Sequence, residues 1–372
     1  MLASILRIVA LARKELLAIL KDPRSRASLF VPPILQCLIY GYAATYDLNS
    51  VPYAVLDQDH SAASHDLLAY LDGSGVFVRV ADLQHESDIS RYIDRQRVLL
   101  VVQIPQDFER SLDSGQPADV QVIADGRNSN TAGTATGYVG AIVDSFNAHW
   151  RADHGMASPP LQVITRAWFN PNLETRWQMI PALIGTLTLL QTLMLTALSV
   201  AREREEGTFD QLLVTPYRPD EIMAGKALPC MLVGVIQATS VLLVAQLWFR
   251  IPFAGSFMTL YAGLVLFLLA AVGIGLMVSS VVATMQQAML FAFVLVMPFA
   301  LLSGLTTPVS NMPMLLQYFT LINPLRYAID IAHRVYLEGA SLGQLVPELW
   351  PLAIIGIITL GAASWMFRNR LA

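Results

Sequence analysis

The chain has 372 residues, of which 55% are hydrophobic and only 14% are charged, with a net charge of −4. Soluble domains usually carry about 25% charged residues, so this composition excludes an ordinary soluble enzyme and indicates an integral membrane protein. The slight acidic balance gives no indication of a nucleic-acid partner. The two cysteines, Cys37 and Cys230, fall in apolar runs and imply no disulfide framework.

Residues 1–26 form an amphipathic helix in this prediction, and they are followed by a first membrane span at 27–46. Asp22-Pro23 breaks the helix before the span. We expect an uncleaved anchor with an interfacial helix on the inner membrane surface, although small residues near Gly41 resemble a signal-peptide cleavage site. The segment carries six basic residues, which are Arg7, Arg13, Lys14, Lys21, Arg24 and Arg26.

Six membrane-spanning helices are predicted from the runs without charged residues. The stretch 251–325 holds no charged residue and is too long for one crossing, so a polar break at 283–287 divides it. Basic residues gather in 1–26, in 201–226 and at the carboxyl end, which places these segments and both termini in the cytoplasm of a bacterial inner-membrane protein. The predicted spans are 27–46, 177–201, 227–249, about 257–281, about 287–304 and 349–367.

Residues 47–176, between the first two spans, change to short apolar runs that alternate with helical patterns. This pattern predicts an inserted extracytoplasmic α/β domain with a parallel or mixed sheet. One cluster of acidic and histidine residues lies at 57–66. It is typical of either a metal site or a polar turn, and we prefer the turn and predict no metal.

The loop 201–226 is polar and lies between two long apolar runs. Gly207 is suited to end the preceding helix, and Pro216 is suited to end a new short one that starts at Thr208. That short helix has one apolar face, which either docks on another protein or lies on the lipid surface. The face is formed by Phe209, Leu212 and Leu213.

No predicted span contains an ionisable residue, so no group at membrane depth would bind a coupling ion. The chain also lacks a phosphate-binding loop, since Gly225-Lys226 has neither the upstream glycine nor the following hydroxyl. Energy must therefore enter through the 201–226 loop.

The prolines in 306–346 predict short re-entrant or outer-surface helices. In the fifth span Gln287, Phe291 and Met297 are candidates for a translocation path, although packing or lipid contact is the alternative.

Two patterns of residues resemble the type-2 permease subunits of ABC exporters, in their drug-export branch, over essentially the whole chain. The first pattern runs from Glu203-Arg204-Glu205 through Gly207-Thr208 to Pro216, and Glu221 and Lys226 follow it. The second includes Leu302-Ser303-Gly304, Pro308, Met312-Pro313, Leu316-Gln317, Asn323-Pro324, Tyr327 and Asp330.

The resemblance implies that the short helix at 208–215 is a coupling helix on a separate ATPase subunit, which binds ATP and Mg. It also implies a second permease subunit, identical or similar, and a periplasmic adaptor of the membrane-fusion type. Glu203, Arg204 and Glu205 would hold the membrane end of the loop.

The expected function is thus an export permease for drugs or other amphipathic compounds, without catalytic residues and without a cofactor of its own. Two alternatives stay open. A membrane-anchored receptor would bind a ligand with its outer domain and signal through the loop, and an ion-coupled antiporter would transport without an ATPase partner.

Overall fold

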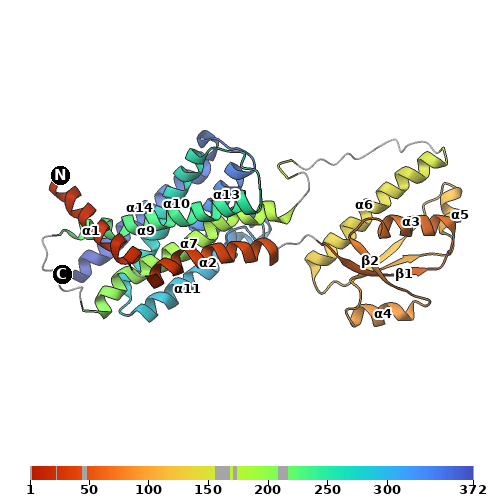
Figure 1. The fold of residues 1–372 in the computed structure, drawn as a ribbon, viewed down its shortest axis with the longest axis horizontal. Helices are drawn as coiled ribbons and strands as arrows, with labels where there is room; N and C mark the ends of the chain where they lie inside the picture. Colours follow the sequence, from red (N-terminus) through yellow and green to blue (C-terminus); the bar gives the residue numbers. More distant parts are fainter. Residues whose placement is uncertain are drawn as a thin grey trace. The chain divides into compact units, whose positions relative to one another are not determined.

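The computed structural model describes residues 2–21, 23–43, 48–155, 168–170, 174–207 and 217–371. The chain divides into two compact units (Figure 1). One consists of Met1–Thr45 and Ala167–Ala372, and its described residues form helices and loops. The other consists of Tyr46–Arg166 and contains a β-sheet with four helices. Each unit has its own hydrophobic core.

Four long helices of the first unit are apolar and long enough to cross a membrane, as judged by length and composition. Two further helices, α2 and α11, carry shorter apolar stretches at Leu29–Ala43 and Met285–Leu301. The total of six spans therefore stays a prediction. The helices of this group are α2 (Pro23–Ala43), α7 (Thr175–Glu205), α9 (Pro219–Leu243, extended by a π-helical turn, η1, at Val244–Trp248), α10 (Phe257–Val281), α11 (Met285–Leu301) and α14 (Val346–Leu371).

Helix α7 lies at the centre of the first unit. It contacts α2, α9, α10, α11 and the shorter α13 (Pro324–Tyr336), and α10 in turn packs along α14. A helix that is apolar on all sides is expected to be surrounded by others, and α7 has buried residues along its whole length. Its packing fixes the arrangement of the helices that carry the 201–226 loop.

Glycines allow the long helices to approach each other closely, as their small size predicts. A Cβ built on Gly275 of α10 would lie 2.7 Å from Cβ of Thr196 on α7. A Cβ on Gly263 would lie 2.7 Å from Cγ2 of Ile331 on α13. These separations are shorter than van der Waals contact, so neither position has room for a side chain.

After α11 the chain forms the short helical segments predicted from its prolines: η2 (Val309–Asn311), α12 (Met314–Thr320), α13 and η3 (Leu342–Leu345). Asn323 connects them to the bundle. Its Oδ1 accepts from the amide of Leu325 at 3.0 Å and so caps α13, while its Nδ2 donates to the carbonyl of Phe299 on α11 at 2.8 Å. The position of these segments relative to the membrane stays a prediction.

Helix α13 carries charged residues along one side. Arg326 donates to the hydroxyl of Thr320 at 2.6 Å, and Arg334 forms ion pairs with Glu348 and Glu338. Asp330 lies one turn from each arginine. Burial raises the pKa of its carboxyl to about 6, against the lowering effect of Arg326 and with a smaller raising contribution from Glu348.

In the second unit, four strands form a mixed sheet in the order β2-β1-β3-β4. The central strand β1 (Val51–Asp57) is parallel to both β2 (Phe77–Asp82) and β3 (Leu100–Ile104), and β4 (Gln121–Ala124) is antiparallel to β3. Alternate residues of β1 enter two separate hydrophobic clusters on opposite faces of the sheet. The helices are α3 (Ala62–Asp72), α4 (Ser87–Asp94), α5 (Phe108–Asp113) and α6 (Ser129–Asp153).

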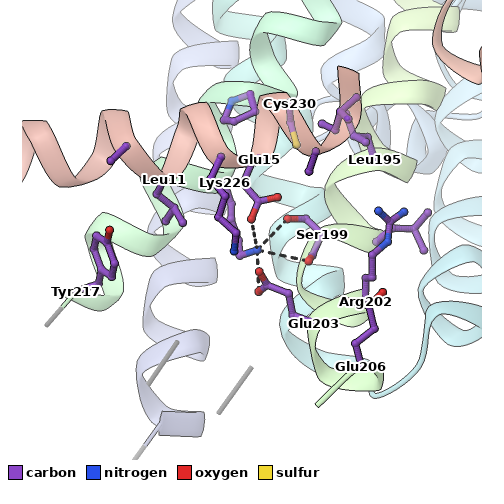
Figure 2. Close-up of a pocket in the computed structure, with 16 residues that line it drawn as sticks. Leu11, Glu15, Leu195, Ser199, Arg202, Glu203, Glu206, Tyr217, Lys226 and Cys230 are labelled. Atoms are coloured by element: carbon purple, nitrogen blue, oxygen red, sulfur yellow. Dashed lines mark hydrogen bonds and ion pairs between the residues drawn. The ribbon is translucent and has the colours of Figure 1, made fainter. Parts of the chain in front are cut away.

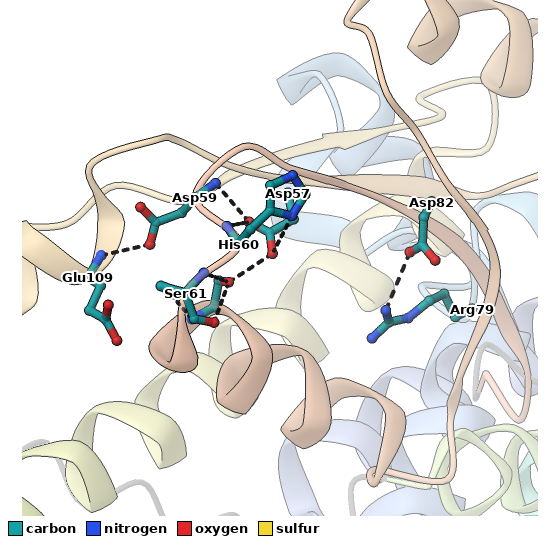
Figure 3. A network of polar contacts seen from close by, with 8 residues as sticks. Asp57, Asp59, His60, Ser61, Arg79, Asp82 and Glu109 are labelled. Carbon is teal, nitrogen blue, oxygen red and sulfur yellow. Dashed lines mark hydrogen bonds and ion pairs between the residues drawn. The ribbon is translucent and has the colours of Figure 1, made fainter.

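The acidic and histidine residues at 57–66 form a polar turn after β1 (Figure 3). Oδ1 of Asp57 accepts from the amides of Asp59 and His60 at 3.0 and 3.1 Å, and its Oδ2 accepts from Oγ of Ser64 at 2.8 Å. Asp59 in turn accepts from the amide of Glu109 at 3.1 Å. The carboxylates therefore satisfy backbone groups. Within the described ranges no group of three or more His, Cys, Asp or Glu is placed to hold a metal ion.

A first prediction concerns the contact at Gly275. Gly275→Ala should destabilise the protein by about 1–3 kcal/mol, because the new methyl group meets the Cβ of Thr196. The matched control is Gly361→Ala in α14, where nothing lies within 4 Å, and where alanine should stabilise by up to about 1 kcal/mol. Melting temperatures of the intact protein in detergent measure both. Similar shifts in the two variants would contradict the close packing of α7 on α10.

A second prediction concerns pH. A carboxyl whose pKa is raised on folding contributes stability that is present at low pH and lost as the pH rises toward the folded value, here between about 4 and 6. Asp330→Asn replaces the carboxyl with an amide that does not titrate, so the variant does not lose this stability as the pH rises. The variant should equal the wild type near pH 4 and exceed it at pH 7 by on the order of 2 kcal/mol. Melting at a series of pH values measures the difference, and a difference that does not change with pH would contradict the burial of this charge.

Candidate functional site

The helices on both sides of the 201–226 loop extend further than the predicted spans. Helix α7 continues to Glu205, and Gly207 follows its cap with a φ of +70°, as predicted for a left-handed helix end. Helix α9 already begins at Pro219, with Asp220 and Glu221 in its first turn. Glu221 therefore lies in the first turn of α9, and Lys226, which the predicted loop 201–226 included, belongs to the same helix. The predicted short helix, with Thr208, Phe209, Leu212, Leu213 and Pro216, lies outside the described residues.

Lys226 is the centre of a buried polar cluster between three helices (Figure 2). Its side chain is 1% exposed, and its ammonium lies 2.8 Å from Oε2 of Glu203 on α7 and 3.4 Å from Oε1 of Glu15 on α1 (Leu2–Lys21). The ammonium also lies 3.4 Å from Oγ of Ser199. A lysine is almost never fully buried unless it is paired, so these contacts determine how the three helices assemble.

A second set of contacts holds α1 on α9, one turn away from Lys226. Glu221, which is 3% exposed, accepts from Arg7 at 2.8 Å and from the hydroxyl of Ser4. Between the two sets Leu11 covers Gly225, where a Cβ would lie 2.5 Å from Cδ2 of that leucine. Helix α1 is therefore fixed to the beginning of α9 by an ion pair on each side of an apolar contact.

The next two residues of α7 reach other helices. Arg204 donates to the carbonyls of Ser280 and Val282 at 3.2 and 3.0 Å, at the C-terminal end of α10. Glu205 accepts from the amide of Met285 at 2.8 Å, at the N-terminus of α11. The signs of both charges match the helix dipoles, because cations are favoured at C-termini and anions at N-termini. The motif Glu203-Arg204-Glu205 thus contacts the ends of three neighbouring helices.

A cavity of about 540 Å³ lies beside the Lys226 cluster, between α1, α7 and α9. Its walls combine charged side chains with an apolar surface. The charged groups are Lys14, Glu15, Arg202, Glu203, Glu206 and Lys226, and the apolar ones include Leu11, Ile19, Leu195, Leu198, Pro229 and Cys230.

Three of the predicted site residues lie inside the bundle of this chain. Glu203, Glu221 and Lys226 are buried, so they contact helices of this chain and present little surface to another protein. Their neighbours Glu15, Arg7 and Ser199 were missed by sequence reasoning, which treated 1–26 only as a surface helix. The sequence feature that could have indicated these contacts is Glu15, the single acidic residue in 2–21.

The candidate path residues lie on α11. Phe291 and Met297 are 50% and 52% exposed, whereas Ala292 is buried. Gln287 accepts from the amide of Ala283 at 3.0 Å at the beginning of the helix. None of the three path residues lines the cavity between α1, α7 and α9. Their role in a path stays a prediction.

Comparison with known proteins identifies the class. Residues 27–365 match the family described as ABC-2 family transporter protein, and the chain belongs to this family. It is 41% identical over 365 residues to the "Probable multidrug ABC transporter permease YbhR" of Escherichia coli, covering 98% of this chain and 99% of that protein. It is also 30% identical over 374 residues to the "Probable multidrug ABC transporter permease YbhS" of E. coli, covering 98% and 97%.

A more distant relative is the "Linearmycin resistance permease protein LnrN" of Bacillus subtilis, 23% identical over 383 residues. The predicted membership of the ABC exporter permeases is therefore confirmed, including its similarity to YbhR. The chain is a membrane-embedded transport subunit, and membership of this class implies an ATPase subunit as its partner.

A third prediction tests the buried cluster. Lys226→Met should destabilise the protein by about 3–5 kcal/mol, because it leaves the buried Glu203 and the half-buried Glu15 without their cation. Combining it with Glu203→Gln and Glu15→Gln should recover most of the loss. Unfolding of the intact chain in detergent micelles measures each variant. The control is Arg202→Gln, which neutralises an exposed neighbour and should stay within about 0.5 kcal/mol of wild type. A Lys226→Met variant as stable as this control would refute the cluster's role.

Proposed function

We propose that this chain is the permease subunit of an ATP-driven exporter that moves drugs or other amphipathic compounds out of the cytoplasm or the inner membrane. A separate ATPase subunit docks on the 201–226 loop and supplies the energy. The main support is the set of contacts at both ends of the loop. Glu203, Arg204 and Glu205 join α7 to α9, α10 and α11, and Lys226 of α9 also pairs with Glu15 of α1, so a displacement of the loop would be passed to these helices.

The distribution of charge supports this source of energy. The apolar runs of the spans contain no Asp, Glu, Lys or Arg, and the buried pair Glu203–Lys226 lies where α7 and α9 adjoin the loop. An ion-coupled antiporter needs a titratable group near the middle of the membrane. The chain therefore responds to a force applied at the loop. The names of the relatives, which are ABC transporter permeases, are consistent with energy supplied by a separate ATPase subunit.

ATP and Mg bind to the partner subunit in this proposal. The sequence has no phosphate-binding loop. Gly225-Lys226, the nearest match, lies within a helix, and the ammonium of Lys226 is held by two carboxylates. No residue of this chain is assigned a catalytic role, and the receptor alternative finds no support in the names of the relatives.

A second permease subunit, a homodimer partner or a similar chain, would complete the transport path. The exposed apolar side chains of α11, which include Phe291, Phe293 and Met297, are a surface for that subunit or for lipid. The basic residues near both ends of the sequence support a cytoplasmic position of the termini and a periplasmic position of residues 47–176, where an adaptor protein would meet them.

A fourth prediction tests the docking of the loop. Phe209→Asp puts a charge on the apolar face of the predicted coupling helix and should weaken association with the ATPase subunit by ~2 kcal/mol or more, about thirtyfold. Substrate-stimulated ATP hydrolysis by the assembled, reconstituted complex should be lost while the chain still inserts into the membrane.

The matched control is Gln211→Glu, which adds the same charge to the polar side of that helix and keeps a residue suited to the capping box. Stimulated hydrolysis that survives Phe209→Asp, or that is lost equally in Gln211→Glu, would refute the docking assignment. Uphill transport by vesicles that contain an ion gradient but no nucleotide would refute the ATP-driven function itself.

A further inference from the structure

The side of α1 that faces away from α9 is uncovered and largely apolar. Leu11 is buried against α9, whereas five large apolar side chains on the free side are between 39% and 62% exposed. They recur along the helix at a spacing that keeps them on one side. These residues are Ile5, Leu6, Val9, Leu17 and Leu20.

The charges on α1 are sorted in the same way. Arg13 and Lys21 are exposed, and Lys14 lines the cavity between α1, α7 and α9. The only acidic residue in 2–21 is Glu15, and Figure 2 shows it pointing from α1 toward the ammonium of Lys226. Pairing with Lys226 therefore removes the one negative charge from the free side. What remains exposed is apolar and basic.

We propose that this free side of α1 binds anionic phospholipid headgroups, with Arg13 and Lys21 at the phosphates and the five apolar side chains at the boundary of the acyl chains. A membrane surface offers an apolar layer and negative charge along one plane, which matches a helix of 20 residues, about 30 Å long. Exposed basic residues are attracted to such a surface.

The contacts to α9 keep the free side in a fixed orientation. The ion pairs Glu15–Lys226 and Arg7–Glu221 lie on either side of Leu11, so α1 does not turn about its axis without breaking one of them. The surface is thus presented to the bilayer as a rigid part of the bundle. The proposal rests on the cytoplasmic position of residues 1–26 in the proposed function, but not on ATP or transport.

The fifth prediction measures which lipid lies next to α1. Val9→Cys, in a background where the buried Cys37 and Cys230 are replaced by alanine, carries an environment-sensitive fluorophore in the full-length protein in lipid nanodiscs. Brominated phosphatidylglycerol and brominated phosphatidylcholine, at equal mole fractions, serve as quenchers. Quenching by the anionic lipid should exceed that by the zwitterionic lipid about threefold or more, because each basic residue enriches anionic lipid near it.

The double variant Arg13→Gln with Lys21→Gln should reduce this ratio to one. The control, Arg202→Gln with Arg368→Gln, removes the same charge from exposed positions at the ends of α7 and α14 and should keep the ratio. A ratio of one in the unsubstituted protein, or equal loss in both double variants, overturns the proposal. Absence of quenching by either lipid also overturns it and indicates an acidic protein surface as the occupant.

Discussion

The arrangement of the first unit depends on one buried ammonium group. Lys226 is 1% exposed and has a carboxylate on α7 and another on α1 within reach. A buried ion pair is weak evidence for stability as such, because the desolvation of both charges offsets much of their attraction. The loss of one partner, however, leaves a charge without compensation. The cluster therefore restricts α1, α7 and α9 to the arrangement in which all its charges are satisfied.

This restriction is important because apolar packing alone does not fix how the long helices are oriented. Apolar spans in a membrane associate through packing, and here glycines such as Gly263 and Gly275 bring the helices close together. Packing of this kind permits small shifts between helices. The directional polar contacts around Glu203, Arg204 and Glu205 are concentrated at the loop end, so that end defines which helices move together.

Sequence reasoning predicted what depends on local chemistry. Gly207 ends α7 and the prolines after α11 limit the following helices, because each acts on its own backbone. The pair Glu15–Lys226 was not predictable in the same way. Its residues lie 211 positions apart, and the packing of α1 on α9, with Leu11 over Gly225, brings them together. One helix boundary also differs, since Lys226 was the last residue of the predicted loop 201–226 and lies inside α9.

The order of charges in Glu203-Arg204-Glu205 follows from helix geometry. Consecutive residues of an α-helix point about 100° apart, so three in a row at the end of α7 face three different neighbours. One direction meets the buried cation of α9, the next meets the carbonyls that end α10, and the third meets the free amide at the beginning of α11. In each direction, the group that the side chain meets favours the sign of charge that the sequence has at that position. A lysine at 203 or an acid at 204 would place like charges together, so the alternation acid–base–acid is a consequence of what surrounds the helix end and is independent of which compound is transported.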